Sequence, residues 1–341
     1  MRGGRRTNKG NEFIMNIKIN RLTSMEVAVL AYSAITLIMI LFYWNGLANP
    51  WGMVGLRLLT VGIIAVTNLT ARFCHLDGKD AVWGGRLGTG LRVFPLMVLL
   101  IWWYPETYDF CSQLPYKDHV FAGIDQALFG CQPALTFDQL LPSAFWSEAF
   151  NMGYYAYYYM MAAVIVFYLI RRYPKFDKAM FIFIGSFFLF YFIYEFLPVA
   201  GPQYYFKALS NLGYPADGSA LPDLGDYFKS HTDMIVPEIK GIFSQLVIGA
   251  QEIGERPTAA FPSSHVGMST VSMLLALRSG NRRLLWILMP FYVLLCCATV
   301  YIKAHYLIDS IAGFFTAVLF YFVMSKVYGW VLNIHRYNNE A

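Results

Sequence analysis

The chain has 341 residues, of which 57% are hydrophobic and only 14% are charged, whereas about a quarter of the residues in an average soluble domain carry a charge. With a mean hydropathy of +0.45, this composition excludes a disordered chain, a fibrous repeat and a small disulfide scaffold, and it indicates a protein surrounded by lipid. The net charge is +5, and its meaning depends on where the basic residues lie.

The N-terminal segment is basic and polar and contains no apolar run, so it does not resemble a cleavable signal peptide, and translation could start at Met15. Apolar runs of about the length that a helix needs to cross the hydrocarbon core follow it. They lie at about 27–47, 54–73, 90–105, 151–171, 179–199, 262–279, 284–304 and 306–328. Because a bilayer leaves no backbone group unpaired, these runs predict an all-α polytopic bundle of about six to eight transmembrane helices.

The positions of Lys and Arg predict the orientation of these helices, because cytoplasmic loops carry the positive excess. With the N-terminus inside, most of the 26 basic residues fall in cytoplasmic segments. Topology then explains the net charge, and no nucleic-acid partner is needed. Both termini are predicted to be cytoplasmic, and the long loops 105–150 and 200–261 lie on the non-cytoplasmic face. The short loops suit a bacterial inner membrane, with a Golgi membrane as the alternative.

This topology predicts how the chain is divided. The parts are a basic cytoplasmic segment (1–26), N-terminal membrane helices (27–105), an outer interfacial loop (106–150), a catalytic membrane core that includes the loop 200–261 (151–330) and a cytoplasmic tail (331–341). In the first loop, Trp146 suits the level of the lipid head groups. In the second loop, apolar residues from Ile239 to Ala250 recur at helical spacing, which predicts about four turns of interfacial helix.

Ionisable residues within or beside membrane spans are costly, and they therefore mark candidate functional positions. In the predicted topology such residues fall at the outer ends of spans, although they come from separate stretches of the chain. They are Glu195, Arg256, His265, His305 and Asp309. We therefore expect a single site on the outer side of the bundle.

The stretch ERPTAAFPSSHVGMS, residues 255–269, is typical of a phosphate-binding helix start. Pro262 suits the first turn of a helix, so the amides of Ser263, Ser264 and His265 would point outward, a geometry that binds phosphate. Arg256 could clamp phosphate oxygens with its planar donors. The alternative is an ordinary helix start with a buried, hydrogen-bonded histidine, and the fragment alone supports both interpretations about equally.

In TVYIKAHYLIDSIAG, residues 299–313, His305 and Asp309 are four residues apart and share one face of a helix. The carboxylate could accept from one imidazole nitrogen and leave the other nitrogen as a nucleophile or base. Half of a metal site is the alternative, which the lack of further ligands at matching spacing disfavours.

Together, Arg256-Pro257, Pro262-Ser263-Ser264-His265 and His305 with Asp309 resemble the signature of the type-2 phosphatidic acid phosphatase superfamily. The branch of inositol phosphorylceramide synthases and sphingomyelin synthases is similar in four further motifs, which are IDQALFG (124–130), GYYAYYYM (153–160), VAGPQYYF (199–206) and HYLID (305–309). Two cations of the superfamily pattern are missing, since their positions hold Gly249 and Thr299. Lys303 or Lys240 could substitute for them out of register.

The resemblance implies that His305 attacks phosphorus to form a phosphohistidine, that Asp309 holds its tautomer, and that His265 protonates the leaving oxygen and later activates the acceptor. The implied phosphate-binding residues are Arg256, Ser263, Ser264 and Lys303. No metal ion or cofactor is required. Glu195 and Tyr204 are candidates for contact with the head group, although Glu195 could equally pair with a buried Arg. For the tyrosines at 154–159, an aromatic belt is favoured over a head-group cradle.

The predicted function is that of a lipid phosphotransferase that moves a head group such as phosphoinositol from a phospholipid donor to a lipid alcohol. The alternative is a lipid phosphate phosphatase that uses water as the acceptor. A transporter is disfavoured because the sequence shows no inverted repeat, and a structural scaffold would leave the His, Asp and Arg residues unexplained. We expect a pocket open to the outer leaflet, with His265 and His305 within about 10 Å of each other. Cys111 and Cys131 form the pair that could be oxidised on the outer side.

Overall fold

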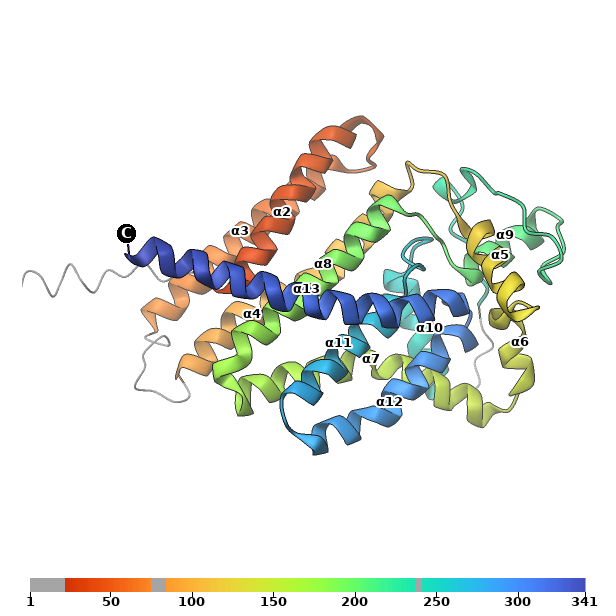
Figure 1. Ribbon diagram of the computed structural model, residues 1–341. Helices are drawn as coiled ribbons and strands as arrows, with labels where there is room; N and C mark the ends of the chain where they lie inside the picture. The colour runs from red at the N-terminus through yellow and green to blue at the C-terminus, as the bar shows by residue number, and fades with distance from the viewer. Residues whose placement is uncertain (1–21, 75–83, 237–240, 341) are drawn as a thin grey trace, which may run out of the picture.

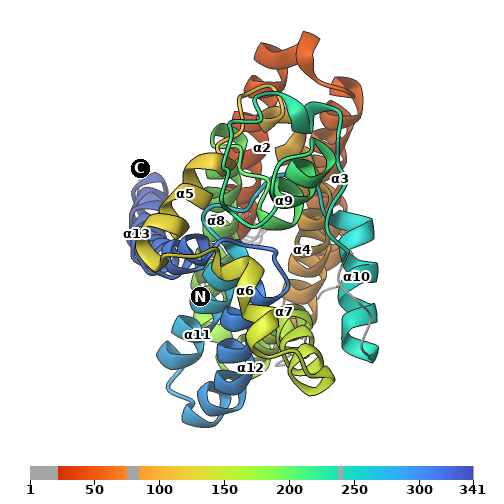
Figure 2. The same ribbon diagram turned by 90° about the vertical axis from the view of Figure 1, so that its right-hand side faces the viewer.

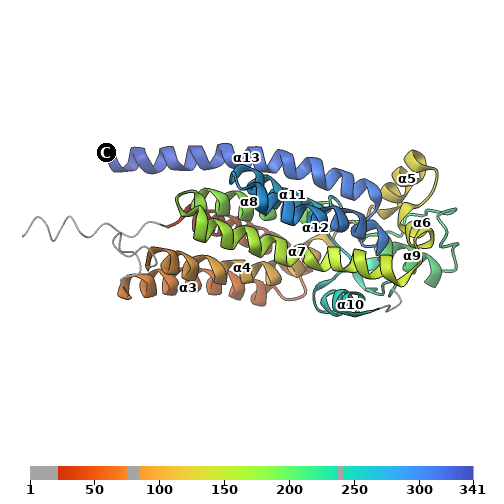
Figure 3. The ribbon, with the colours of Figure 1, turned by 90° about the horizontal axis from the view of Figure 1, so that it is seen from below.

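The computed structural model describes residues 22–74, 84–236 and 241–340, and these residues form helices and connecting loops without a strand. The long helices run roughly along one direction, and the short helices gather at one end of the bundle (Figures 1 and 3). Within the described ranges, 7 helices are long and apolar enough to cross a membrane. The predicted polytopic helical bundle is therefore confirmed.

The N-terminal part consists of α2 (Ser24–Tyr43), α3 (Pro50–Phe73) and α4 (Gly84–Cys111). Thr23 and Glu26 cap the start of α2 with reciprocal hydrogen bonds, which satisfies amides that the first turn would leave unpaired. The helix α4 is longer than the predicted span 90–105 and contains Pro95 and Pro105. Neighbouring helices allow prolines inside a membrane helix, so these residues do not mark its ends.

The remaining long helices are α7 (Ala144–Arg171), α8 (Phe176–Phe196), α11 (Ser264–Arg278), α12 (Arg282–Tyr301) and α13 (Leu307–Glu340). Most side chains of α8 are buried, so this helix forms the centre of the bundle. At Gly153 of α7 an added Cβ would lie 2.5 Å from the Cβ of Leu294. This glycine therefore lets α7 and α12 approach closely, as small residues do in membrane bundles.

The short helices are α5 (Asp118–Phe129), α6 (Pro133–Leu140), α9 (Pro202–Asn211) and α10 (Ile242–Gly254), with 3-10 turns at Trp44–Gly46, Tyr173–Lys175 and Tyr227–Lys229. The helix α10 confirms that a helix of about the predicted length lies in this loop, and its position at the membrane interface stays a prediction. Ile239 and Lys240 lie outside the described residues. The helices α4 and α7 extend into the predicted loop 106–150, so the connection between them runs from Ser112 to Ser143. Trp146 lies in the first turn of α7, where it is partly exposed.

The two long connections lie at the same end of the bundle. Helices α5, α6 and α9 are at this end, and the start of α2 and the end of α13 are at the opposite end (Figures 1 and 2). The two long connections therefore share one end of the bundle, and the orientation of the chain in a membrane stays a prediction.

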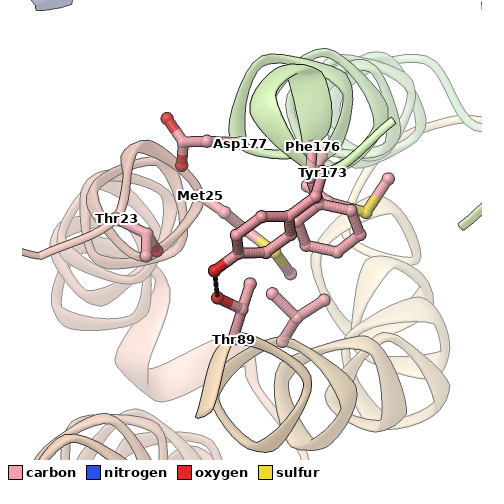
Figure 4. Close-up of a pocket in the computed structure, with 8 residues that line it drawn as sticks. Thr23, Met25, Thr89, Tyr173, Phe176 and Asp177 are labelled. Carbon is pink, nitrogen blue, oxygen red and sulfur yellow. Dashed lines mark hydrogen bonds between the residues drawn. The ribbon is translucent and has the colours of Figure 1, made fainter. Parts of the chain in front are cut away.

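A cavity of about 310 Å³ lies between α2, α4 and α8, towards the end that holds the start of α2 (Figure 4). The hydroxyls of Thr89 and Tyr173 in its wall are 2.8 Å apart. Asp177 accepts hydrogen bonds from the amide of Ser24 at 3.0 Å and from the hydroxyl of Tyr328 at 3.1 Å. These polar groups join neighbouring elements, so they have a structural role.

Candidate active site

His305 lies in the short loop between α12 and α13, where its side chain is 4% exposed. Its Nδ1 donates a hydrogen bond to the carbonyl oxygen of Ala260 at 2.8 Å. Oδ2 of Asp309 is 3.8 Å from the same nitrogen and accepts from the amide of Tyr306 at 2.9 Å. The expected direct carboxylate–imidazole hydrogen bond is thus replaced by a bond to a backbone carbonyl, because Asp309 caps the first turn of α13 instead.

A carbonyl oxygen can only accept, so the hydrogen bond from Nδ1 places the proton of a neutral ring on that nitrogen. Nε2 of His305 then carries the free lone pair. Burial lowers the pKa of His305 to about 4, against the smaller opposing effect of the Ala260 carbonyl. The ring is therefore uncharged at neutral pH, as a nitrogen nucleophile must be.

His265 lies on the first turn of α11, close to His305. The centroids of the two imidazole rings are 5.8 Å apart, well inside the expected limit. The ring of Tyr154 stacks on His265 with a centroid distance of 4.5 Å, and that of Tyr157 lies at 4.6 Å. These two tyrosines point into the bundle, whereas Tyr159 of the same cluster is exposed. The favoured aromatic-belt interpretation is therefore wrong for the inward pair.

The turn before α11 differs from the predicted phosphate loop. The helix begins at Ser264 instead of Pro262, and Ser263 is its N-cap, with Oγ accepting from the amide of Val266 at 3.4 Å. The amide of Ser263 is not free, because it donates to the carbonyl of Asp309 at 3.0 Å. An added Cβ at Gly313 would lie 2.4 Å from the Ser263 carbonyl, so α13 packs directly on this turn.

The predicted cations of the site have protein partners. Arg256 is half-buried, and its Nη1 donates to the carbonyl of Glu255 at 2.7 Å. The ammonium group of Lys303 forms an ion pair with Asp138 of α6. The expected phosphate contact of Lys303 thus competes with a carboxylate, and Lys240 lies outside the described residues.

Two buried carboxylates that the sequence analysis did not single out fasten the loop of His305. Asp118 accepts from the amides of Ala200 at 2.9 Å and Gly201 at 2.8 Å, and from the hydroxyl of Tyr306 at 3.2 Å. Burial raises the pKa of Asp118 to about 6, and its hydrogen bonds oppose this shift.

Asp125 accepts from the amides of Leu307 at 2.8 Å and Ile308 at 3.0 Å, which caps α13 directly after His305. Both carboxylates belong to α5, and Asp125 is part of the IDQALFG motif. The available signal was two acidic residues seven positions apart, a spacing of about two helical turns that places both on one face of the helix.

The two candidates for head-group contact have other surroundings. Oε1 of Glu195 accepts from the hydroxyl of Tyr32 in α2 at 2.9 Å. The buried Arg57 of α3 is paired with Glu106. Tyr204 is buried in a cluster with the aromatic rings of Tyr116 and Phe228. Neither Glu195 nor Tyr204 lines the cavity beside His265.

That cavity has a volume of about 390 Å³ and lies between α4, α7, α8, α10 and the start of α11. Its wall is mostly apolar and aromatic. Its polar lining includes Gln251, Glu255, Ser264 and His265. A mostly apolar cavity of this size with a few polar groups is typical of a small-ligand site.

All five cysteines are free, including Cys111 and Cys131, so the pair that could be oxidised is not joined. Sγ of Cys111 is instead 3.1 Å from Oγ1 of Thr258, the residue that follows Arg256-Pro257. In the described part of the chain, no group of three His, Cys, Asp or Glu side chains has an arrangement that could hold a metal ion.

A model of the PAP2 superfamily matches residues 121–323, which is more than half of the chain. The protein therefore belongs to the PAP2 superfamily, whose membrane members are phosphatases and phosphotransferases. The matched part runs from α5 into α13 and leaves α2, α3 and α4 outside it. No curated protein and no solved structure matches the chain.

Proposed function

We propose that the protein transfers a phospho-head group, such as phosphoinositol, from a phospholipid to a lipid alcohol through a phosphohistidine on His305. The observation that carries this proposal is the pair of imidazoles, with His305 buried and His265 half-buried, whose ring centroids are 5.8 Å apart. One phosphorus atom between them would be within reach of both. Inositol phosphorylceramide synthase-like transfer is the specific form of the reaction that the sequence resemblance suggests.

In the first half of the proposed reaction, Nε2 of His305 attacks phosphorus, and the bond from phosphorus to the lipid oxygen breaks. Burial lowers the pKa of His265 to about 3, so His265 takes up its proton only when the anionic phosphate group lies beside it. It then donates this proton to the lipid oxygen, which leaves as a lipid alcohol. Arg256, the hydroxyl of Ser263 and the amide of Ser264 stabilise the charge on the other phosphate oxygens. Asp309 and the Ala260 carbonyl hold His305 in position. In this step, side chains and backbone groups of the protein supply the nucleophile, the proton and the groups that stabilise the phosphate.

In the second half, His265 accepts the proton of the acceptor hydroxyl, whose oxygen attacks phosphorus as the bond to His305 breaks. Water in place of the lipid alcohol would make the protein a lipid phosphate phosphatase. The apolar cavity beside His265 supports the lipid alcohol as the acceptor, because its wall suits hydrocarbon better than water.

The proposed topology places both termini in the cytoplasm and the active site on the non-cytoplasmic face of a bacterial inner membrane. Support comes from the basic residues of the cytoplasmic segments and from the position of α5, α6 and α9, at the end of the bundle opposite the end of α13 (Figure 1).

The test is incubation of the purified protein with a phospholipid labelled at phosphorus, with and without a lipid alcohol such as ceramide or diacylglycerol. We expect label to appear on a second lipid, and an acid-labile labelled protein to accumulate when no acceptor is added. A labelled water-soluble phosphate, which would be the phosphorylated head group or free phosphate according to the donor, would as the main product instead establish the phosphatase.

His305→Ala should abolish both turnover and labelling of the protein, since it removes the nucleophile. His231→Ala is the matched control, because His231 is an exposed histidine that bonds to Ser230 and Tyr227. A folded His305→Ala protein with near-normal turnover would contradict the assignment of the nucleophile.

A further inference from the structure

The 390 Å³ cavity beside His265 is not made by the family core alone. The helix α4, which lies outside the PAP2 match, supplies a large part of its apolar wall, including Met97, Leu100 and Tyr104. The helix α10 closes another side with Val247 and Gln251. The cavity therefore depends on α4, which lies outside the family match, as well as on helices inside that match.

The position of the cavity relative to the histidines indicates which part of a substrate fits there. His265 lines the cavity and His305 does not. In phosphoryl transfer the attacking and leaving atoms lie roughly in line across phosphorus. The oxygen that leaves, or that later attacks, is therefore on the side of phosphorus away from His305, where His265 and the cavity lie.

The polar groups at the cavity indicate what kind of lipid would satisfy them. Within the described residues, Oε1 of Gln251 and the hydroxyl of Tyr154 are buried without a hydrogen-bond partner, in side chains that are 3% and 6% exposed. A buried unpaired polar group costs about 1–3 kcal/mol. A ligand with hydroxyl or amide donors would satisfy the Gln251 oxygen.

Glu255 lines the same cavity and adds a further acceptor. Burial raises the pKa of Glu255 to about 7, and a hydrogen bond from Tyr104 and the nearby Arg256 oppose this shift. Near and above neutral pH the carboxylate repels a phosphate group and accepts from a hydroxyl or amide.

We propose that this cavity holds the lipid-alcohol partner of the reaction, and that Gln251 and Glu255 select an uncharged lipid with hydrogen-bond donors beside its reacting hydroxyl. This inference rests on the proposed transferase function. The same cavity holds the alcohol released from the donor and then the alcohol that accepts the phospho-head group. In the second step the hydroxyl proton passes to His265, the new oxygen–phosphorus bond forms, and the bond from phosphorus to His305 breaks.

A route into the cavity lies between α4 and α7. Its lining residues Val98 and Ile101 on α4 and Tyr158 on α7 are 48%, 64% and 52% exposed. The helix α7 packs extensively on α12 and only slightly on α4. A hydrocarbon chain in the surrounding lipid can therefore enter sideways without displacing a polar surface.

The first test labels the full-length protein in nanodiscs with a ceramide that carries a photoreactive group on its acyl chain, because the amide and second hydroxyl of ceramide are donors beside the reacting hydroxyl. We expect labelled peptides from α4, α7 and α10, and about tenfold less labelling in Val98→Trp, which places a large ring at the opening. Val61→Trp is the matched control, because Val61 is 50% exposed on α3 and does not line the cavity. Labelling of these peptides that Val98→Trp leaves unchanged would overturn the position of the lipid alcohol.

The second test compares that probe at pH 8 with a non-hydrolysable phosphonate analogue of ceramide phosphate that carries the same chains. We expect the uncharged probe to label the cavity about tenfold more strongly, and Glu255→Gln to remove most of this preference. Equal labelling by the two probes in the unsubstituted protein would overturn the selective role of Gln251 and Glu255.

Neither labelling test requires turnover. A protein that binds the uncharged lipid in the cavity but never forms an acid-labile phosphoenzyme would therefore contradict the proposed function and leave the cavity assignment in place. A protein that forms the phosphoenzyme but shows no cavity labelling would contradict the cavity assignment alone.

Discussion

The family core and the N-terminal helices use their buried polar groups differently. In the core, the carboxylates of Asp118 and Asp125 bind backbone amides around the loop of His305. In the N-terminal helices, buried charges bind one another. Glu26 pairs with Arg92 of α4 and also accepts from Asn68 of α3 at 3.0 Å.

The two kinds of contact have different roles, because one positions the loop of His305 and the other holds helices together. A carboxylate that binds the amides of a loop determines where that loop lies, and here the loop carries the proposed nucleophile. An ion pair between helices joins them inside lipid without contacting the site. The N-terminal helices are thus expected to affect the chemistry through the cavity wall and the stability of the bundle, whereas changes in the core should affect the chemistry directly.

The largest effect on the core side is expected from His265→Asn. Removal of a general acid and base lowers turnover by about 10²–10⁴-fold, and the phosphoenzyme should persist longer once it forms, because the acceptor is no longer activated. Rapid-quench measurement of labelled protein and lipid product checks both effects. A His265→Asn protein with unchanged turnover would remove His265 from the proposed mechanism.

On the N-terminal side, Glu26→Ala should destabilise the bundle by roughly 3–5 kcal/mol, because it leaves Arg92 buried without its carboxylate partner. The side chains of Glu26 and Arg92 are 1% and 9% exposed. Unfolding in detergent, followed by the fluorescence of the tryptophans, measures the loss. The double variant Glu26→Ala with Arg92→Met should recover part of the stability, and turnover per folded molecule should stay near that of the unsubstituted protein. A large loss of turnover in the folded fraction would contradict the proposal that this ion pair stabilises the bundle without affecting the active site.

A smaller effect is expected from Asp125→Ala, which removes the cap of α13 beside His305. Loss of a helix cap costs about 0.5–2 kcal/mol, and the freed loop should lower the rate of phosphoenzyme formation several-fold as well. Asp125→Asn keeps one acceptor oxygen and should have an intermediate effect. A loss of stability with an unchanged rate would show that Asp125 supports the fold without positioning His305.

The predictions from sequence succeeded where a short pattern determines the outcome. Apolar runs located the 7 helices that are long and apolar enough to cross a membrane, although the predicted span 262–279 is the shorter helix α11. The spacing of His305 and Asp309 correctly placed the carboxylate near the ring, but the prediction that both residues lie on a helix is wrong for His305, which precedes α13 in a loop. The pairing of His265 with His305 came from the family resemblance, since no local pattern joins positions 40 residues apart. Hydropathy alone misplaced the ends of α4, because its last turns contain Glu106 and Asp109.

The contacts that sequence could not predict depend on the path of the backbone. The partner of His305 is a carbonyl oxygen of Ala260, which any residue at that position would supply. The roles of Asp118 and Asp125 likewise depend on which amides the folded loops present to them. The partner of Lys303, Asp138, lies in a short helix whose packing no periodicity indicates.

The smallest expected effect concerns pH and tests whether the core holds His305 neutral. The pKa of His305 is lowered to about 4, chiefly by burial, and only the unprotonated ring can attack phosphorus. The unprotonated, nucleophilic ring therefore becomes the main form of His305 as pH rises through about 4, and it stays the main form above about pH 5. An ordinary histidine, with a pKa of about 6.5, would lose roughly nine-tenths of its unprotonated form by pH 5.5. Single-turnover phosphoenzyme formation in the His265→Asn protein, which removes the other imidazole, should be nearly unchanged between pH 7 and pH 5.5. A rate that falls about tenfold over this interval, with a midpoint near the ordinary value, would show that the Ala260 turn does not exclude water from His305 as the structure indicates.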